Sequence, residues 1–399
     1  MTGSSPAQAS PSLTWRQVCD RRLAAHRLDV PAGPDALAEV AGAMCGVHAQ
    51  VMSAAELSLG VRTASGTRED VRRALWEDRT LVKTYGPRGT VHLFPVGELA
   101  LWTGALGAVP AAGGGLPQAA RLDPEQTEAV VAAVGEALRD AELTVDELSE
   151  AVIGACGDWA GDKVVPGFTD LWPRWRQAVH TAAHRGVLCF GPMRGRKVTY
   201  TGPGRWVPGF VPAAPGAALA EVVRHYLRAY GPASPQHFAQ WLSAPKKWAA
   251  DLFASLAAEL REVRVEGAAP GETLWELAGA PAAGEGAAAP GLHLLPYFDA
   301  YVIGSHPRPL VFPGPEAAER ALARGQAGPV QVLVSGGTVA GIWHQKRSGK
   351  RLDITVEAFG ELPPGGREEL ARRAERIGEV LQTKPPTLAF GAVTAGKHL

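Results

Sequence analysis

Three stretches rich in alanine, glycine and proline interrupt the chain and divide it into four parts. They lie near residues 104–120, 211–219 and 278–291 and show no hydrophobic periodicity. A chain of 399 residues is too long for one ordinary core, so two to four modules are expected. We therefore predict a disordered tail and four modules, with the boundaries 1–12, 13–106, 119–210, 216–280 and 291–399.

The second module shows the clearest local pattern. Thr144 and Glu147 form a predicted capping box that opens a helix, and a second helix is predicted over residues 171–185. A β-rich run, residues 186–202, follows this helix directly. Helix followed by hairpin is the order of a winged-helix unit.

The first and third modules show related patterns. The first has a helical run from Trp15 to Trp76 and then an alternating segment, residues 81–95, which predicts a hairpin. The third has predicted helices at 221–231, 234–243 and 252–265 and a strand near 273–277. Three comparable units suggest internal repetition, although no residue-level repeat is visible.

The fourth module changes to strands. These are predicted within residues 292–304, 330–345 and 350–359, and an amphipathic helix over 366–382 is expected to pack across them. The predicted fold class is therefore α+β, with three tandem winged-helix units followed by a C-terminal β-barrel or sheet with a packed helix.

Charge and cysteine content restrict the partners and the compartment. Lys and Arg together number 40, as do Asp and Glu, so any contact with nucleic acid must come from local patches. The four cysteines are far apart and form no C-x-x-C pair, which argues against a zinc module or a disulfide framework. We find no secretory leader or membrane-spanning stretch, and we expect a cytoplasmic, nucleoid-associated monomer without cofactor.

Residues 45–63 form the most informative segment. Ser53 and Glu56 predict a capping box, which places His48 and Gln50 in a loop just ahead of a helix. Inside a regular helix these two residues would point to nearly opposite sides, whereas in a loop they can converge on one substrate. A loop histidine and glutamine more often simply cap a helix or bind backbone groups, and the residues alone leave both interpretations open.

The segment His48-Ala49-Gln50 resembles the catalytic motif of the AlkZ-like winged-helix DNA glycosylases, which read Gln-x-Gln or Gln-x-Asp in this loop. The resemblance also covers residues 82–95, 230–243 and 294–304, so it spans nearly the whole chain. It implies tandem winged-helix units around duplex DNA and hydrolysis of the N-glycosidic bond of alkylated purines. His replaces Gln at the first motif position, which leaves the substrate range open.

The chemistry also follows from the residue types. A purine alkylated at N7 or N3 is cationic, so its leaving group is already activated and the protein mainly needs to place a water molecule. Neutral His48 can accept a proton from that water, while the amide oxygen of Gln50 holds it and opposes the charge that develops on the sugar. Because no lysine occupies the motif, no Schiff-base strand cleavage is expected.

Three clusters of residues are candidate DNA contacts. The first alternates along one face of a predicted strand, the second occupies the predicted wing of the second module with no acid nearby, and the third crowds a C-terminal hairpin turn. Each can alternatively be a solvated strand face or loop tip. The three clusters are Arg88, Thr90 and His92; Arg194, Arg196 and Lys197; and Lys346, Arg347, Lys350 and Arg351.

Two further features favour structural roles. Asp299 is expected to hold a buried turn rather than to act in catalysis. His180 and His184 have the i,i+4 spacing of metal ligands, but no third ligand accompanies them, so no metal site is predicted.

Two function classes remain. The first is a monofunctional DNA glycosylase that removes bulky or crosslinked alkylpurines, and the His-containing motif resembles that of members associated with self-resistance to DNA-alkylating natural products. The second is a winged-helix transcription regulator or a non-catalytic lesion-binding protein. Release of a base from alkylated duplex DNA separates them.

Overall fold

The computed structural model describes residues 12–110, 117–167, 170–280 and 291–394. The predicted tail up to residue 11, and the central parts of two predicted linkers, 111–116 and 281–290, lie outside the described residues. Contacts between residues divide the chain into two units. The first unit combines residues 1–32, 223–240 and 246–399, and the second combines 33–222 and 241–245. The helix at the start of the predicted module 13–106 thus groups with the C-terminal half of the chain.

The second unit begins with a small sheet surrounded by helices. Its strands pair in the order β2-β4-β3, all antiparallel, and the hairpin predicted over residues 81–95 is formed by β3 and β4. Thr67 and Asp70 form a capping box at the start of α4. The elements are α2 (Leu37–Ala43), β2 (Val47–His48), α3 (Met52–Gly60), α4 (Arg68–Trp76), β3 (Leu81–Tyr85), η1 (Pro87–Gly89), β4 (Val91–Pro95), η2 (Val96–Glu98) and α5 (Leu99–Leu106).

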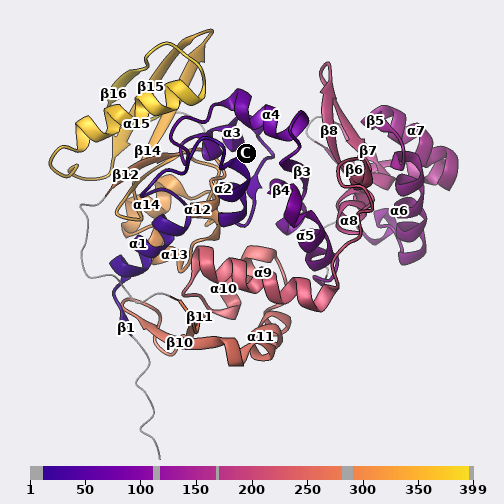
Figure 1. The fold of residues 1–399 in the computed structure, drawn as a ribbon, viewed down its shortest axis with the longest axis horizontal. Helices are drawn as coiled ribbons and strands as arrows, with labels where there is room; N and C mark the ends of the chain where they lie inside the picture. The colour runs from indigo at the N-terminus through magenta and orange to yellow at the C-terminus, as the bar shows by residue number, and fades with distance from the viewer. Residues whose placement is uncertain (1–11, 111–116, 168–169, 281–290, 395–399) are drawn as a thin grey trace, which may run out of the picture. The chain divides into compact units, whose positions relative to one another are not determined.

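The rest of the second unit has the helix-then-hairpin order that the sequence predicts. The Thr144–Glu147 capping box is present at the start of α7, and the strands pair in the order β5-β9-β8 (Figure 1). The elements are η3 (Gln118–Ala120), α6 (Pro124–Leu138), β5 (Glu142–Thr144), α7 (Val145–Cys156), η4 (Asp158–Gly161), β6 (Lys163–Pro166), β7 (Leu171–Pro173), η5 (Arg174–Ala178), α8 (Val179–His184), β8 (Cys189–Arg194), β9 (Lys197–Thr201) and η6 (Pro203–Arg205).

The single helix predicted over residues 171–185 is wrong in its first half. Leu171–Pro173 is the short strand β7, and Arg174–Ala178 is a 3-10 turn before α8 begins. Pro173 explains the difference, because the residue before a proline is driven into extended conformations and proline cannot donate a backbone hydrogen bond.

The first unit contains the N-terminal helix and the third predicted module. β1 pairs in parallel with β10, and β10 pairs with β11. The helix predicted over 252–265 is wrong at its end, because Leu260–Val265 alternates as strand β10, with Leu260 and Val263 buried. The elements are β1 (Ser12–Leu13), α1 (Trp15–Ala25), α9 (Pro215–Tyr230), α10 (Pro235–Leu242), α11 (Lys246–Ser255), η7 (Ala257–Glu259), β10 (Leu260–Val265) and β11 (Leu274–Leu277), of which α9 and α10 also carry residues of the second unit.

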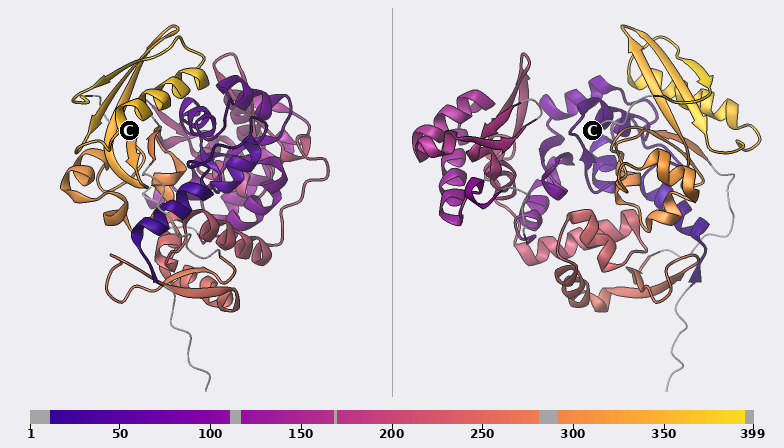
Figure 2. Two further views of the ribbon diagram at one scale, coloured as in Figure 1. Left: turned by 60° about the vertical axis from the view of Figure 1, so that its left-hand side comes forward. Right: turned by 180° about the vertical axis from the view of Figure 1, so that it is seen from behind.

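The C-terminal part of the first unit is a five-stranded sheet in the order β12-β13-β14-β15-β16. Within the described residues it is an open sheet and not a closed barrel, and only the β15–β16 pair is parallel. Helix α15 lies along this sheet and buries Leu370, Ala374 and Ile377 (Figure 2). The elements are β12 (Leu292–Leu295), α12 (Ala300–Gly304), α13 (Arg308–Val311), α14 (Gly314–Ala321), β13 (Val332–Ser335), β14 (Thr338–Ser348), β15 (Arg351–Ala358), α15 (Gly366–Val380) and β16 (Thr387–Phe390).

A buried arginine joins distant segments of the first unit. Arg22 on α1 is 2% exposed. Its guanidinium donates to the carbonyl oxygens of Gly231 (3.4 Å), Pro232 (3.1 Å) and His306 (2.8 Å). Burial lowers its pKa. A carbonyl oxygen that is removed from water needs a donor within the protein, and the guanidinium supplies one to all three of these groups.

Arg22→Met is expected to destabilise the first unit by about 3 kcal/mol, because it takes this donor away from buried carbonyl oxygens. The change is measured by chemical unfolding followed by circular dichroism. Arg16→Met on the same helix is the control, since Arg16 makes a partly exposed pair with Asp20 and should change stability by less than about 1 kcal/mol. Equal stability of the two variants would contradict this role of Arg22.

Candidate active site

His48 lies on a strand and not in the predicted loop. It ends β2 and is the direct cross-strand partner of His92 on β4. Its side chain is 8% exposed. Burial and, to a smaller extent, the positive charge of Arg88 lower the pKa of His48 to about 4. The imidazole is therefore neutral at pH 7 and can accept a proton.

Gln50 is exposed two residues further along the chain. The amide of Ala49 donates to the carbonyl of Val91 at 2.7 Å, so the pairing with β4 continues one residue beyond β2. Strand β2 ends at His48, and the chain bends at Gln50. Gln50 thus lies in the predicted connection ahead of α3, and only His48 belongs to a strand.

The predicted capping box of Ser53 and Glu56 is wrong. Helix α3 begins at Met52, and its N-cap residue, Val51, makes no side-chain capping bond. Ser53 is exposed, whereas Glu56 is 1% exposed and pairs with Arg72 of α4 at 2.7 Å. Glu56 lies one turn into the helix on its buried face, where a cation from the neighbouring helix satisfies it.

A column of rings packs against His48. The His92 ring centroid lies 5.3 Å from that of His48, and His92 stacks on Phe94 at 5.7 Å. Phe94 in turn stacks on Trp102 at 4.6 Å. His92 Nδ1 is 2.9 Å from the carbonyl of Thr90, so this nitrogen carries the proton when the ring is neutral. The contact fixes the ring that packs against His48.

Glycines make room for this column. A Cβ on Gly86 would lie 2.6 Å from Nδ1 of His92, and a Cβ on Gly46 would lie 2.4 Å from the ring of Phe94. Gly46 also has φ +91, a conformation that favours glycine. The turn after β3 and the turn before β2 can therefore reach the rings only as glycines.

The prediction that Arg88, Thr90 and His92 alternate on one strand face is wrong. Pro87 and Gly89 (φ +66) break the strand, so Arg88 lies in the turn η1 with φ +62 and donates to the carbonyl of Trp241. The Thr90 hydroxyl donates to the carbonyl of Pro87 at 3.0 Å and closes this turn. Only His92 is on β4, where it is 4% exposed and packs against His48.

The predicted wing is present as the hairpin of β8 and β9 (Figure 1), but acids do lie beside it. Arg194 pairs with Glu147 at 2.9 Å, and Lys197 pairs with Asp146 at 2.8 Å. Both acids belong to the first turn of α7, which the sequence separates from the wing by some fifty residues. Arg196 is exposed in the turn between the strands. Exposed pairs of this kind are weak, so a phosphate can compete for these cations.

The C-terminal cluster also lies on a hairpin, at the β14–β15 turn. All four of its side chains are exposed. Asp353 pairs with Arg351 at 3.0 Å and faces Lys346 across the strands. The four residues are Lys346, Arg347, Lys350 and Arg351.

The residues expected to be structural are placed as follows. Asp299 is 1% exposed and accepts a hydrogen bond from the amide of Tyr301 at 3.0 Å, which caps α12 and confirms the expected role. His180 and His184 lie one turn apart on α8, with ring centroids 5.9 Å apart. Among the described residues there is no group of three or more His, Cys, Asp or Glu that can hold a metal ion. None of the described helices combines the length and apolarity needed to cross a membrane.

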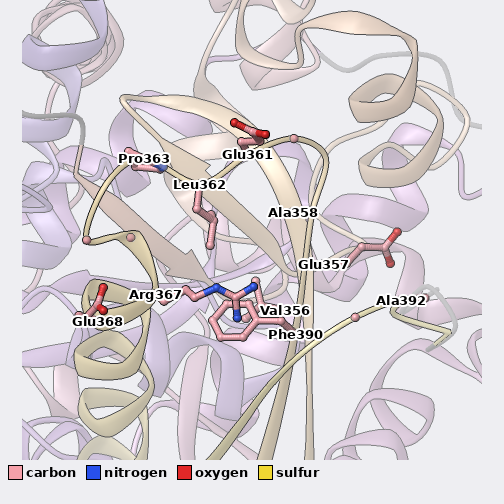
Figure 3. Close-up of a pocket in the computed structure, with 14 residues that line it drawn as sticks. Val356, Glu357, Ala358, Glu361, Leu362, Pro363, Arg367, Glu368, Phe390 and Ala392 are labelled. Atoms are coloured by element: carbon pink, nitrogen blue, oxygen red, sulfur yellow. The ribbon is translucent and has the colours of Figure 1, made fainter.

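Two of the cavities among the described residues bear on the chemistry, although neither is lined by His48 or Gln50. One of about 840 Å³ belongs to the C-terminal sheet, where the guanidinium of Arg367 lies 4.3 Å from the ring centroid of Phe390 and the carboxylates of Glu361 and Glu368 stand at its walls (Figure 3). The other, of about 440 Å³, is in the second unit and is lined by Arg88, His180 and His184. The sequence drew attention to these two histidines only for their metal-ligand spacing, and no metal site was predicted there. No local signal connects them with Arg88, because about ninety residues separate them.

Comparison with known proteins places the whole chain in a family. The model of a family described as DNA glycosylase AlkZ-like matches residues 41–380. A curated protein of Streptomyces sahachiroi, "Interstrand DNA cross-link repair glycosylase", is 35% identical over 351 residues, which cover 83% of this chain and 87% of that protein. The solved structure of Streptomyces sahachiroi DNA glycosylase AlkZ matches with a TM-score of 0.79 and 28% identity, covering 95% of this chain and 100% of that one. The match of the family model over most of the chain, together with the shared fold, shows that this protein belongs to the AlkZ-like DNA glycosylase family.

Proposed function

We propose that the protein is a monofunctional DNA glycosylase that hydrolyses the N-glycosidic bond of N7- or N3-alkylated purines in duplex DNA and leaves an abasic site. The observation that carries the proposal is a neutral, buried His48 at the end of β2, two residues before an exposed Gln50. Membership of a DNA glycosylase family supports the reaction class.

In the proposed reaction the bond between C1′ of the sugar and the purine nitrogen breaks, and its electron pair neutralises the cationic purine. The oxygen of a water molecule forms the new bond to C1′, and its proton passes to His48. The Gln50 amide oxygen holds the water and opposes the positive charge that grows on the sugar. Neither residue needs to protonate the leaving group.

The low pKa of His48 makes it a weak base, and a weak base suits this substrate. Alkylation has already activated the leaving group, so little further catalysis is needed. An unmodified purine is neutral and leaves slowly, and a site of this strength does not release it. We therefore expect discrimination against normal bases from the chemistry as well as from shape.

The register of the sheet supports hydrolysis without strand cleavage. Thr84, His92 and His48 are successive cross-strand partners and share one face, whereas Lys83 pairs with Leu93 on the alternate face. The Lys83 ammonium lies 4.9 Å from the ring centroid of Phe190. The sheet thus holds the nearest strand lysine away from the face that carries His48, and no Schiff base is expected there.

The two basic hairpins are proposed to grip the DNA backbone. Each presents exposed cations at a turn, and the acids beside them form solvent-exposed or partly exposed pairs. Together with the helix-then-hairpin order around α8, this arrangement supports the tandem winged-helix organisation that the family resemblance implies. Arg88 is proposed to contact the strand that carries the lesion.

We further propose that the substrate is a bulky or crosslinked adduct and that the protein gives self-resistance to a DNA-alkylating natural product. The name of the Streptomyces sahachiroi relative, an interstrand DNA cross-link repair glycosylase, supports a crosslinked adduct as the first to be tested. The histidine at the first motif position supports a substrate range that differs from that of proteins with glutamine there.

Incubation with duplex DNA carrying N7-alkylguanine is expected to produce alkali-labile breaks, and no breaks before alkali. His48→Ala should lower the single-turnover rate by about 100-fold or more, because it removes the base, and Gln50→Ala should also lower it. Matched controls are His344→Ala and Gln118→Ala, which are expected to retain the full rate. Full activity of His48→Ala would overturn the assignment, and adduct-dependent gel shifts without any base release would favour the lesion-binding alternative.

The single-turnover rate is expected to stay constant from about pH 8 to pH 5 and to fall only as the pH approaches 4. The rate falls toward acid pH because His48 acts as a base only when its ring is neutral. Its pKa is lowered to about 4, so the ring becomes protonated only near that pH. Rates are corrected for enzyme-free depurination, and circular dichroism at each pH checks that the protein is folded. A rate that already halves near pH 6.5 would show an ordinary, solvated histidine instead.

Replacing Arg347 and Lys350 by serine is expected to weaken binding to undamaged duplex DNA and to flatten its salt dependence. The logarithmic slope should change by about 0.9 for each phosphate that the protein no longer neutralises. Dissociation constants are measured by fluorescence anisotropy between low and moderate salt. Lys246→Ser with Lys247→Ser, which removes two exposed cations of α11, is the control for net charge. An unchanged slope in the hairpin variant would show that this turn is only solvated.

A further inference from the structure

We propose that the cavity lined by Arg88, His180 and His184 binds a phosphodiester of the DNA strand that carries the lesion, next to the nucleotide on which His48 acts. The cavity measures about 440 Å³ and belongs entirely to the second unit. This proposal rests on the proposed function, because it names the part of the substrate that the cavity holds.

The lining of the cavity is positive. Arg88 and Arg185 contribute the charges, His180, His184, Thr181 and Ser243 contribute polar groups, and no carboxylate is among the described residues that line it. Arg185 pairs with Glu128 at 3.1 Å, and both of those side chains are more than half exposed. Arginine presents forked N–H donors that match the oxygens of a phosphate. The rest of the lining is glycine and apolar side chains, which are Leu106, Val109, Pro110 and Leu242.

His184 is a second polar residue in the lining of the cavity. Its Nε2 is buried and has no hydrogen-bond partner among the described residues. Burial lowers the pKa of His184 to about 4, so the ring is neutral and one of its nitrogens bears a proton. A buried ring nitrogen without a partner costs stability unless a ligand or water satisfies it. The ring itself lines the cavity, so a phosphate bound there would pack against it.

Packing connects this cavity with the proposed catalytic residue. α8 packs against β3, and the backbone of Tyr85 and Gly86 interacts with the ring of His184. Gly86 also contacts His92, which is the partner of His48 across the strands. The charge of Arg88 reaches both of those histidines, since it lowers the pKa of each. A phosphate held here would therefore be fixed relative to the sugar that His48 faces.

The test replaces single phosphodiesters around an N7-alkylguanine by neutral methylphosphonates. With the wild-type protein, a methylphosphonate at one position is expected to lower the single-turnover rate or the affinity by about 10-fold to 100-fold. Loss of one charged hydrogen bond has an effect of this size. Arg88→Gln should show a loss of similar size on ordinary DNA and no further loss at that one position. Dissociation constants are measured by gel shift for the same duplexes, so the coupling has a readout besides activity.

Two further variants separate binding from folding. Arg88→Lys keeps the charge without the forked donors, so the methylphosphonate at that position should still cause part of the loss seen with wild type. His184→Gln tests the ring that lines the cavity. Thermal unfolding confirms that each variant is folded. Arg139→Gln, which removes an exposed arginine at the end of α6, is the control. This variant should lose as much rate or affinity as wild type when the methylphosphonate is at the position that affects wild type. Base release by wild type without coupling at any position would overturn the phosphate site and leave the glycosylase proposal intact. If the methylphosphonate and Arg88→Gln affect the same step in affinity but no base is released, the phosphate site is supported and the glycosylase proposal is overturned.

Discussion

The pairing of β2 with β4 is the interaction on which the candidate chemistry depends. It places His48 directly opposite His92, and the column that continues through Phe94 and Trp102 fills the space beside the two imidazoles. Burial in this packing keeps His48 neutral near pH 7, which a solvated histidine would be only in part. Without that sheet, the motif would be an ordinary histidine and glutamine ahead of a helix.

The strength of the proposed base and the nature of the proposed leaving group fit each other. A histidine with a pKa near 4 removes a proton weakly, and a cationic alkylpurine departs with little assistance. Positioning of the water and the sugar then contributes more to the proposed rate than the strength of the base. The extended backbone through Ala49, the turn that carries Arg88 and the cavity beside α8 are all parts of one unit, so their relative placement is set by a shared core.

Local signals in the sequence predicted much of the fold. The Thr144–Glu147 capping box, the β3–β4 and β8–β9 hairpins and the amphipathic helix α15 were all visible from short-range pattern. The predicted helix over residues 171–185 was wrong in its first half, because helical spacing of apolar residues competed there with the extended preference imposed by Pro173. The predicted capping pair of Ser53 and Glu56 was wrong because Glu56 instead pairs with Arg72 of the next helix. Residue type alone could not show that Glu56 has a cationic partner sixteen residues away.

For the candidate site, the sequence by itself determined which residues have suitable chemistry: an imidazole, an amide and several arginines at recognisable motifs. Only the tertiary structure decided that His48 is buried and neutral, that His92 is buried opposite it, and that Arg88 shares a cavity with His184. The reason is physical. Proton affinity and donor availability depend on solvent, charge and backbone groups that packing brings together from distant segments, and no short stretch of sequence contains them.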